Sequence, residues 1–187
     1  MNLRRRQCLN FGAALACASA GQLLAQPALC EPDAPAAALP RHLTLHNLHT
    51  SDVLDIDYSQ GGVYLPDAMA KIMQVLRDFR TNEQHDIDPV LLDDLCNLAA
   101  ALRVEPVFDV ISGYRSPQTN ELLRSQSNGV ALHSLHMDGR AIDVRLAGVD
   151  CGDLAARALI LGRGGVGYYR RSDFVHLDTG PPRSWRG

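Results

Sequence analysis

Short segments of alternating hydrophobic and polar residues occur along most of the chain, and segments with an apolar residue at every third or fourth position lie between them. Alternation with a period of two is typical of strands that bury one face, and the longer period is typical of amphipathic helices. Alternation predicts strands over residues 42–47, 53–58 and 140–146, and short apolar segments with β-branched residues or glycines predict strands over residues 107–111, 164–169 and 173–178. The longer period predicts helices over residues 65–80, 88–102, 117–126 and 153–162.

Two of the predicted helices begin with a recognisable cap. Asp88 precedes Pro89, and Ser116 precedes Pro117. Asp and Ser side chains accept hydrogen bonds from the free N–H groups of a first helical turn, and proline is favoured at the first helical position. The apolar stripes that follow these caps are therefore expected to be buried core and not a cofactor site.

The alternation also assigns polar side chains to one face of a strand. His42 and His46 share the polar face of the first predicted strand, so we expect them at the surface and not as metal ligands. In the strand over residues 140–146, Asp143 and Arg145 share one face and the branched apolar residues share the other.

The N-terminus has the pattern of an export signal. Arg4–Arg6 are followed by an alanine-rich apolar run from Leu9 to Ala25, which is too short for a stable membrane span. The consecutive arginines favour a twin-arginine signal, although Cys8 replaces its usual apolar residue. We expect residues 1–28 to be a signal peptide, residues 29–41 a proline- and alanine-rich linker, and residues 42–187 the functional domain of a periplasmic or otherwise exported protein.

Charge and composition exclude some classes of partner. The formal net charge is −3, and removal of the signal arginines would make it more negative. A chain of this charge lacks the basic surface that neutralises phosphates, and 5% aromatic residues offer few platforms for base stacking. We therefore expect no nucleic-acid partner. The five cysteines form no CxxC pair, so a redox motif is not predicted.

The residues that carry chemistry are two histidines and two aspartates. His136 lies seven positions before Asp143, and His176 follows in the last predicted strand. Imidazole nitrogen and carboxylate oxygen are zinc ligands, and catalytic zinc sites use three protein ligands with one position open. The three residues therefore predict a catalytic Zn2+ site. His133 competes with His136 for the first ligand position, and Asp178 either orients His176 or caps the strand end.

A metal of this kind suggests hydrolysis. Asp173 precedes His176 by three positions, so it does not share a strand face with it, and we expect it at the strand start as the general base. Arg115 follows a strand and a glycine turn, where binding residues are common, and a guanidinium suits an oxyanion or a substrate carboxylate.

Residues 134–143 (SLHMDGRAID) and 173–176 (DFVH) together resemble the motifs of the M15 zinc peptidases, the D-alanyl-D-alanine metallopeptidase group, and more closely those of the DUF882 subgroup. The resemblance covers about residues 42–187. It extends to shorter stretches at residues 49–50, 77–80, 87–89, 112–116, 164–169 and 174–180.

The resemblance implies roles for the same residues. It implies that His136, Asp143 and His176 hold zinc, that Asp173 is the acidic base and, more loosely, that Arg115 grips substrate. It also implies an exported peptidase that acts on the stem peptides or cross-links of peptidoglycan. The predicted export signal agrees with this independently.

We therefore predict a single α+β domain of the D-alanyl-D-alanine metallopeptidase and Hedgehog type, with a mostly antiparallel sheet and flanking helices. The leading function is a zinc-dependent murein endopeptidase that cuts cross-links. The alternatives are a D,D-carboxypeptidase or dipeptidase, and a catalytically silent zinc-containing module that binds the cell wall, because a shared fold and ligand set do not guarantee turnover.

Overall fold

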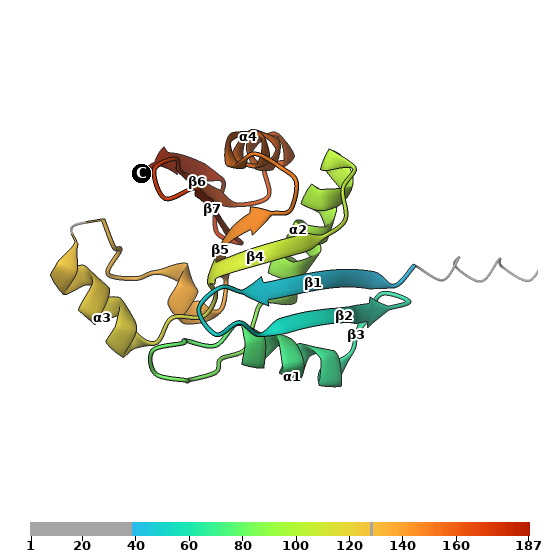
Figure 1. Ribbon diagram of the computed structural model, residues 1–187, viewed down its shortest axis with the longest axis horizontal. Helices are drawn as coiled ribbons and strands as arrows, with labels where there is room; N and C mark the ends of the chain where they lie inside the picture. The colour runs from blue at the N-terminus through green and yellow to red at the C-terminus, as the bar shows by residue number, and fades with distance from the viewer. Residues whose placement is uncertain (1–38, 128) are drawn as a thin grey trace, which may run out of the picture. The chain divides into compact units, whose positions relative to one another are not determined.

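The computed structural model describes residues 39–127 and 129–187, and its strands form one eight-stranded sheet in the order β3-β2-β1-β4-β5-β7-β6-β8 (Figure 1). The strands are β1 (Arg41–Asn47), β2 (Val53–Gln60), β3 (Val63–Tyr64), β4 (Val107–Ser112), β5 (Ala141–Leu146), β6 (Gly165–Tyr169), β7 (Phe174–Asp178) and β8 (Arg183–Arg186). The helices are α1 (Pro66–Val75), α2 (Pro89–Leu102), α3 (Pro117–Gln126) and α4 (Cys151–Leu161), with a 3-10 turn η1 (Leu135–Asp138).

Most neighbouring strands run antiparallel. The pairs β1/β4 and β6/β8 are parallel, and the other five neighbouring pairs are antiparallel. The predicted α+β domain with a mostly antiparallel sheet and flanking helices is confirmed.

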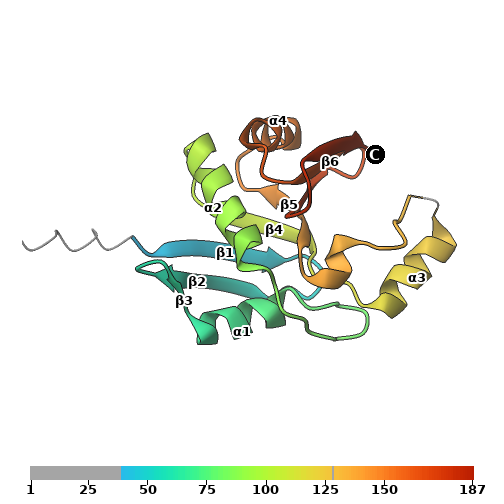
Figure 2. The same ribbon diagram turned by 180° about the vertical axis from the view of Figure 1, so that it is seen from behind.

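The hydrophobic core lies on one face of this sheet. Alternate residues of β4, β5 and β7 point to that face and are buried: Phe108, Val110, Ile142, Val144, Val175 and Leu177. Figure 2 views the molecule from behind and shows α2 lying across this face of the sheet, with α1 and α4 on either side of α2. Burial of one such side chain contributes about 1.5–3 kcal/mol, so this layer is the main stabilising feature of the fold.

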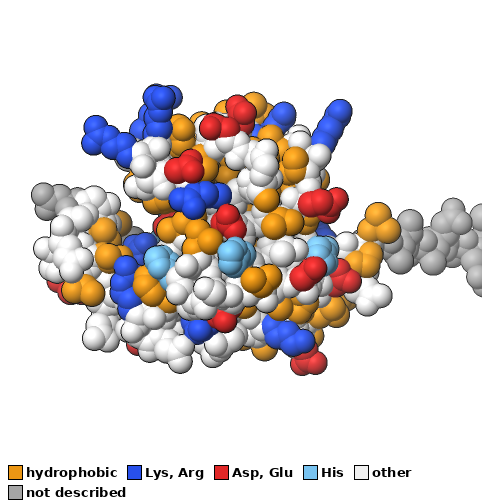
Figure 3. Space-filling view, viewed as in Figure 1, with side chains coloured by type: hydrophobic (Ala, Val, Ile, Leu, Met, Phe, Trp, Pro, Cys, Tyr) orange, Lys and Arg blue, Asp and Glu red, His pale blue; other side chains and the backbone are white. Residues whose placement is uncertain are grey.

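The opposite face of the sheet carries polar side chains. His42 Nδ1 lies 2.9 Å from an oxygen of Asp57, and His46 Nδ1 lies 3.1 Å from an oxygen of Asp109. Figure 3 looks at this face and shows histidine and acidic side chains spread across it. The predicted surface positions of His42 and His46 are confirmed. We refer to this side of the sheet as the open face.

The helix starts follow from local sequence. Asp88 accepts a hydrogen bond from Val90 N at 3.0 Å, and Ser116 accepts one from Thr119 N at 3.2 Å, so both predicted caps are confirmed. Helix α4 begins two residues earlier than predicted because Asp150 is its cap.

The predicted end of the first helix is wrong. The apolar stripe suggested a helix as far as Arg80, but α1 ends at Val75. Its last carbonyls are used by other parts of the chain: Asn47 Nδ2 donates to Val75 O at 2.8 Å, and Tyr114 N donates to Leu76 O at 2.7 Å. These contacts between distant segments end the helix, and a local pattern does not contain them.

The loop after α1 is tied to the start of α3 by one buried carboxylate. Asp78 accepts hydrogen bonds from Ser116 N at 2.9 Å, from Ser116 Oγ at 2.7 Å and from Arg80 N at 2.9 Å. Phe79, which the apolar stripe assigned to the helix, stacks on His49 with ring centroids 3.8 Å apart. This connection fixes the chain next to Arg115.

Three elements were not predicted: β3, η1 and β8. The predicted signal peptide and residues 29–38 of the predicted linker lie outside the described residues. Among the residues that the structure describes, no helix has the length and apolar character needed to cross a membrane.

Candidate metal centre

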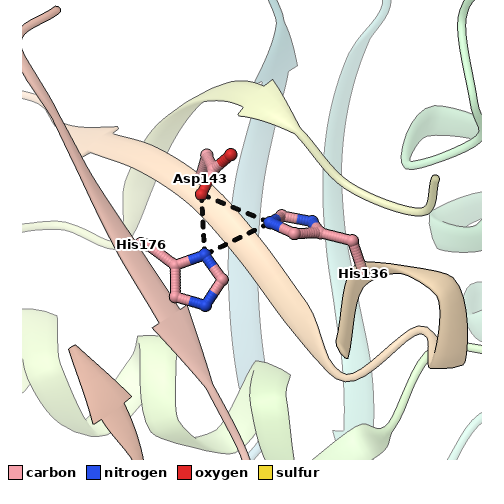
Figure 4. Close-up of side chains that lie close together, drawn as sticks. All are labelled: His136, Asp143 and His176. Carbon is pink, nitrogen blue, oxygen red and sulfur yellow. Dashed lines mark hydrogen bonds and ion pairs between the residues drawn. The ribbon is translucent and has the colours of Figure 1, made fainter. Parts of the chain in front are cut away.

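Three side chains converge on the open face of the sheet (Figure 4). Asp143 Oδ1 lies 2.9 Å from His176 Nδ1 and 3.4 Å from His136 Nε2, and the two nitrogens are 3.2 Å apart. Tetrahedral metal bonds of about 2.1 Å would set ligand atoms roughly 3.4 Å apart. The spacing of the three atoms therefore fits a small divalent metal ion such as zinc.

Local structure explains why the three residues meet. Asp143 in β5 is the direct antiparallel partner of His176 in β7, so both side chains leave the same face. Gly139 ends η1 with φ +65°, which turns the chain from His136 into β5. A Cβ at Gly139 would come within 1.9 Å of Asp86 O, so this turn needs glycine for its space as well as its backbone angle.

Each imidazole has its other nitrogen engaged. His136 Nδ1 lies 2.7 Å from Gly113 O, and His176 Nε2 lies 3.0 Å from Asp178 Oδ2. Both partners are acceptors, so in the neutral rings these nitrogens carry the hydrogen, and the facing nitrogens present lone pairs. Two lone pairs and a carboxylate oxygen then point at one another, which favours a bound cation between them. The donor set fits a metal.

Asp178 is the buried carboxylate that orients His176. It also accepts hydrogen bonds from Gly165 N at 3.1 Å and from Gly180 N at 2.8 Å, and it pairs with Arg183 Nη2 at 2.6 Å. Burial disfavours the charged carboxylate, but the bonds from His176, Arg183 and Gly180 outweigh it and hold the pKa of Asp178 well below its usual range. Of the two roles considered for Asp178, the structure shows the orienting contact.

The charges within the donor set are coupled. Burial raises the pKa of Asp143, but the two imidazoles beside it outweigh this effect, and the net pKa is well below the usual range. Burial is the main cause that lowers the pKa of His136. Burial also acts against the charged form of His176, but the carboxylates of Asp143 and Asp178 beside it favour that form and raise the pKa.

A cavity of about 440 Å³ adjoins the donor set, within the size range of small-molecule sites. Arg115 lines it from the β4 side, with Nη2 3.9 Å from Asp143 Oδ2 and only 13% of its side chain exposed. Arg115 N donates to His136 O at 3.1 Å, which ties this residue to the η1 turn. Burial lowers the pKa of Arg115 and Asp143 opposes this; an arginine nevertheless stays charged in proteins.

Aromatic side chains line the cavity from the β6 side. Tyr169 stacks on Phe174 with ring centroids 4.5 Å apart, and Trp185 Nε1 donates to the Tyr169 hydroxyl at 3.0 Å. The Trp185 ring lies 5.0 Å from the ring of His176. No sequence motif assigned Trp185 to the site. The alternation in β6 and β7, which puts Tyr169 and Phe174 on the same face as His176, was the available signal for this wall.

Asp173 is not brought into this group. It directly precedes β7 with φ +52°, its side chain is 68% exposed, and its Oδ2 lies 3.4 Å from Arg145 Nε. The cavity is lined by Arg115 and the three converging residues, and Asp173 is not among the described residues that line it. His133, which competed with His136 in the sequence, lines the cavity but does not join the donor set.

Comparison with known proteins agrees with this arrangement. An M15 peptidase family model described as peptidoglycan L,D-endopeptidase MepK matches residues 35–185. The chain belongs to this family. The resemblance to M15 peptidases that the motifs indicated is thereby confirmed.

Individual curated relatives agree with this family assignment. Peptidoglycan L,D-endopeptidase MepK of Escherichia coli K12 is 44% identical over 146 residues, which cover 78% of this chain and 80% of the relative. The protein of the same name from Shigella flexneri has the same identity and coverage. The probable peptidoglycan L,D-endopeptidase MepK of Haemophilus influenzae is 42% identical over 149 residues, which cover 79% of this chain and 80% of the relative. No solved structure gives a significant match.

Proposed function

We propose that this protein is an exported zinc-dependent endopeptidase that hydrolyses peptide cross-links of peptidoglycan, at bonds between an L-centre carbonyl and a D-centre amine. The observation that carries the proposal is the convergence of His136, Asp143 and His176 donor atoms, 2.9–3.4 Å apart, beside a cavity. Family membership and the names of the relatives support the peptidoglycan substrate and the L,D bond.

His136 Nε2, Asp143 Oδ1 and His176 Nδ1 are the atoms that would hold the metal. Zinc in such a site supplies Lewis-acid chemistry, which polarises a carbonyl and makes water a better nucleophile near neutral pH. The chain supplies the fixed orientation of the ligands, because Gly113 O and Asp178 hold the two imidazoles from behind.

Arg115 is proposed to hold an anionic group of the substrate. Its guanidinium is largely buried, lines the cavity and lies near the carboxylate of Asp143. A guanidinium can grip a carboxylate with two parallel hydrogen bonds, which fixes the substrate in register with the donor set. It would also attract negative charge that develops on the attacked carbonyl oxygen.

Asp173 is proposed as the base that takes a proton from the attacking water and passes it to the leaving amine. Its position three residues before His176 and its left-handed backbone, which is uncommon for residues other than glycine, support a functional role. For this role the side chain has to leave Arg145 and turn toward the cavity. Its ion pair with Arg145 is exposed, so breaking that pair has a small energetic cost.

The test of the function is digestion of defined muropeptides by the zinc-loaded protein, followed by mass spectrometry. We expect dimers joined by an L,D bond to yield monomers. Cleavage of only D,D-linked dimers would contradict the bond assignment, and release of only a terminal D-alanine would identify a carboxypeptidase. A protein that binds zinc and peptidoglycan but cleaves none of these substrates would be a silent binding module.

The test of the base is the variant Asp173→Ala, with Asp138→Ala as a matched control at another exposed aspartate. We expect Asp173→Ala to lose muropeptide hydrolysis while it retains bound zinc, and Asp138→Ala to keep both. If Asp173→Ala remains active, the base assignment is wrong and the metal assignment stands. His133, which lines the cavity, is then the next residue to replace.

A further inference from the structure

The aromatic wall contains a hydroxyl that the proposed mechanism does not use. In the antiparallel pair β6/β7, Gly167 lies opposite His176, and Tyr169 lies opposite Phe174. Tyr169 is therefore on the open face. Along the two strands, Tyr169 and Phe174 are the next pair on that face after the pair that contains His176, a proposed metal ligand. Its neighbour Tyr168 points to the other face and packs against the core.

The Tyr169 ring is held on more than one side. It stacks on Phe174 with an interplanar angle of 15°. A Cβ at Gly187 would come within 2.3 Å of its Cδ1 and Cε1 atoms, so the backbone at Gly187 also packs against the ring. A ring held in this way keeps its hydroxyl in one place, and little conformational entropy is lost when the hydroxyl meets a substrate.

The hydrogen of this hydroxyl is free to be donated. An indole N–H is a donor only, so the bond from Trp185 Nε1 at 3.0 Å occupies a lone pair of the Tyr169 oxygen. Within residues 39–127 and 129–187, that is the one hydrogen bond found for this hydroxyl. By contrast, the hydroxyls of Tyr58 and Tyr64 donate to Asp93 at 2.9 and 2.8 Å.

Trp185 connects this hydroxyl to the donor set. Its indole lies directly over Gly167, where a Cβ would come within 2.5 to 2.7 Å of three ring atoms. The same indole lies 5.0 Å from the His176 ring. The absence of a side chain at Gly167 thus lets the indole sit beside His176, and the indole in turn positions the Tyr169 hydroxyl at the cavity.

We propose that Tyr169 is a further catalytic residue, whose hydroxyl donates a hydrogen bond to the carbonyl oxygen of the scissile peptide bond. This inference rests on the proposed function. When the water oxygen bonds to the carbonyl carbon, the π electron pair moves onto the carbonyl oxygen, and Tyr169 stabilises that charge while its proton stays on the phenol. The C–N bond then breaks, and the amine leaves with the proton that the base received from the water.

Strand order places Arg115 on the other side of the donor set from this hydroxyl. Arg115 follows β4, the proposed metal ligands lie on β5, β7 and η1, and Tyr169 lies on β6, so a substrate above the donor set has a cation on one side and a phenol on the other. A donor that acts on charge formed only during the reaction should affect kcat more than KM.

The test compares wild type with Tyr169→Phe in the zinc-loaded full chain, with an L,D-linked muropeptide dimer as substrate. The variant keeps the ring that stacks on Phe174 and loses only the hydroxyl. We expect kcat to fall roughly a hundredfold, the size of effect seen when one oxyanion donor is removed. KM, bound zinc and the melting temperature should stay close to those of wild type. Tyr168→Phe is the matched control and should keep wild-type kcat.

A second variant, Trp185→Phe, leaves the hydroxyl but removes the N–H that positions it, so we expect a smaller loss of kcat. Wild-type kcat in Tyr169→Phe would overturn the inference and leave the proposed function intact. A rise in KM alone, or loss of zinc from Tyr169→Phe, would also overturn it. If the wild type itself cleaves no dimer, the proposed function fails and this inference fails with it.

Discussion

Gly139 and Gly148 share a left-handed backbone conformation, but only one of them lacks space for a side chain. Comparing them distinguishes the energetic cost of the backbone conformation from the cost of a steric clash. Gly139 has φ +65° and Gly148 has φ +75°, but only Gly139 has a neighbour, Asp86 O, where a Cβ would be placed. Gly148 has open space around it. Because Gly139 joins His136 to β5, the strand that carries Asp143, its conformation also sets the distance between two proposed metal ligands.

We therefore expect Gly139→Ala to destabilise the protein by more than Gly148→Ala. The control should cost about 1–2 kcal/mol for the left-handed backbone alone. Gly139→Ala should add the cost of moving Asp86 away and should also lower zinc affinity. Urea unfolding and competition with a zinc chelator measure the two effects. Equal destabilisation in both variants, with unchanged zinc affinity, would contradict this account.

At the scale of elements, sequence reasoning succeeded where one segment determines its own structure. The cap at Asp88 and the cap at Ser116 fixed the starts of α2 and α3, and local sequence patterns located six of the strands. It failed where contacts with a distant segment determine where an element ends. Helix α1 ends at Val75 because Asn47 and Tyr114 bind its last carbonyls, and no local pattern contains those contacts.

The connection between the α1 loop and α3 gives a prediction that depends on pH. Burial raises the pKa of Asp78, but hydrogen bonds from Thr119, Ser116 and the N–H of Arg80 outweigh it, and the net pKa is lowered. A carboxyl whose pKa is lower in the folded state stabilises the fold above its unfolded pKa of about 3.9. That contribution is lost as pH falls through the folded pKa.

Asp78→Asn should therefore lower the free energy of unfolding by about 1–3 kcal/mol at neutral pH, since an amide satisfies these donors less well. The difference from wild type should shrink below about pH 4. Asp86→Asn, at an exposed aspartate in the same loop, is the control. Chemical unfolding across this pH range measures the effect, and a difference that does not depend on pH would contradict it.

In the described part of the chain as a whole, the core and the candidate site lie on opposite faces of one sheet. The helices cover the face with Ile142 and Val144, and the donor set lies on the face with Asp143. The three converging residues were predictable, because their spacing and residue types indicate zinc. The wall of Tyr169 and Trp185 was not, because it depends on how β8 pairs with β6, and a four-residue strand after two prolines has no clear alternation.

This separation predicts that metal removal affects activity more than folding. Treatment with a chelator should abolish muropeptide hydrolysis, and added zinc should restore it. Because the core does not contain the donor set, the protein without metal should keep its far-UV circular dichroism, with a melting temperature several degrees lower as expected for loss of a bound ligand. Unfolding on chelation would show that the metal is structural as well as catalytic.

The exposed contact between Arg145 and Asp173 affects how often the Asp173 side chain adopts each of its two orientations. Their side chains are 35% and 68% exposed, and such pairs contribute about 0–1 kcal/mol. An energy of 1 kcal/mol corresponds to about a fivefold ratio between two states. On the proposed role of Asp173, this ion pair alone would thus favour the orientation that faces Arg145 by at most about five to one. Arg145→Gln should therefore raise kcat by no more than roughly fivefold, and less at high salt, where wild type already loses this contact.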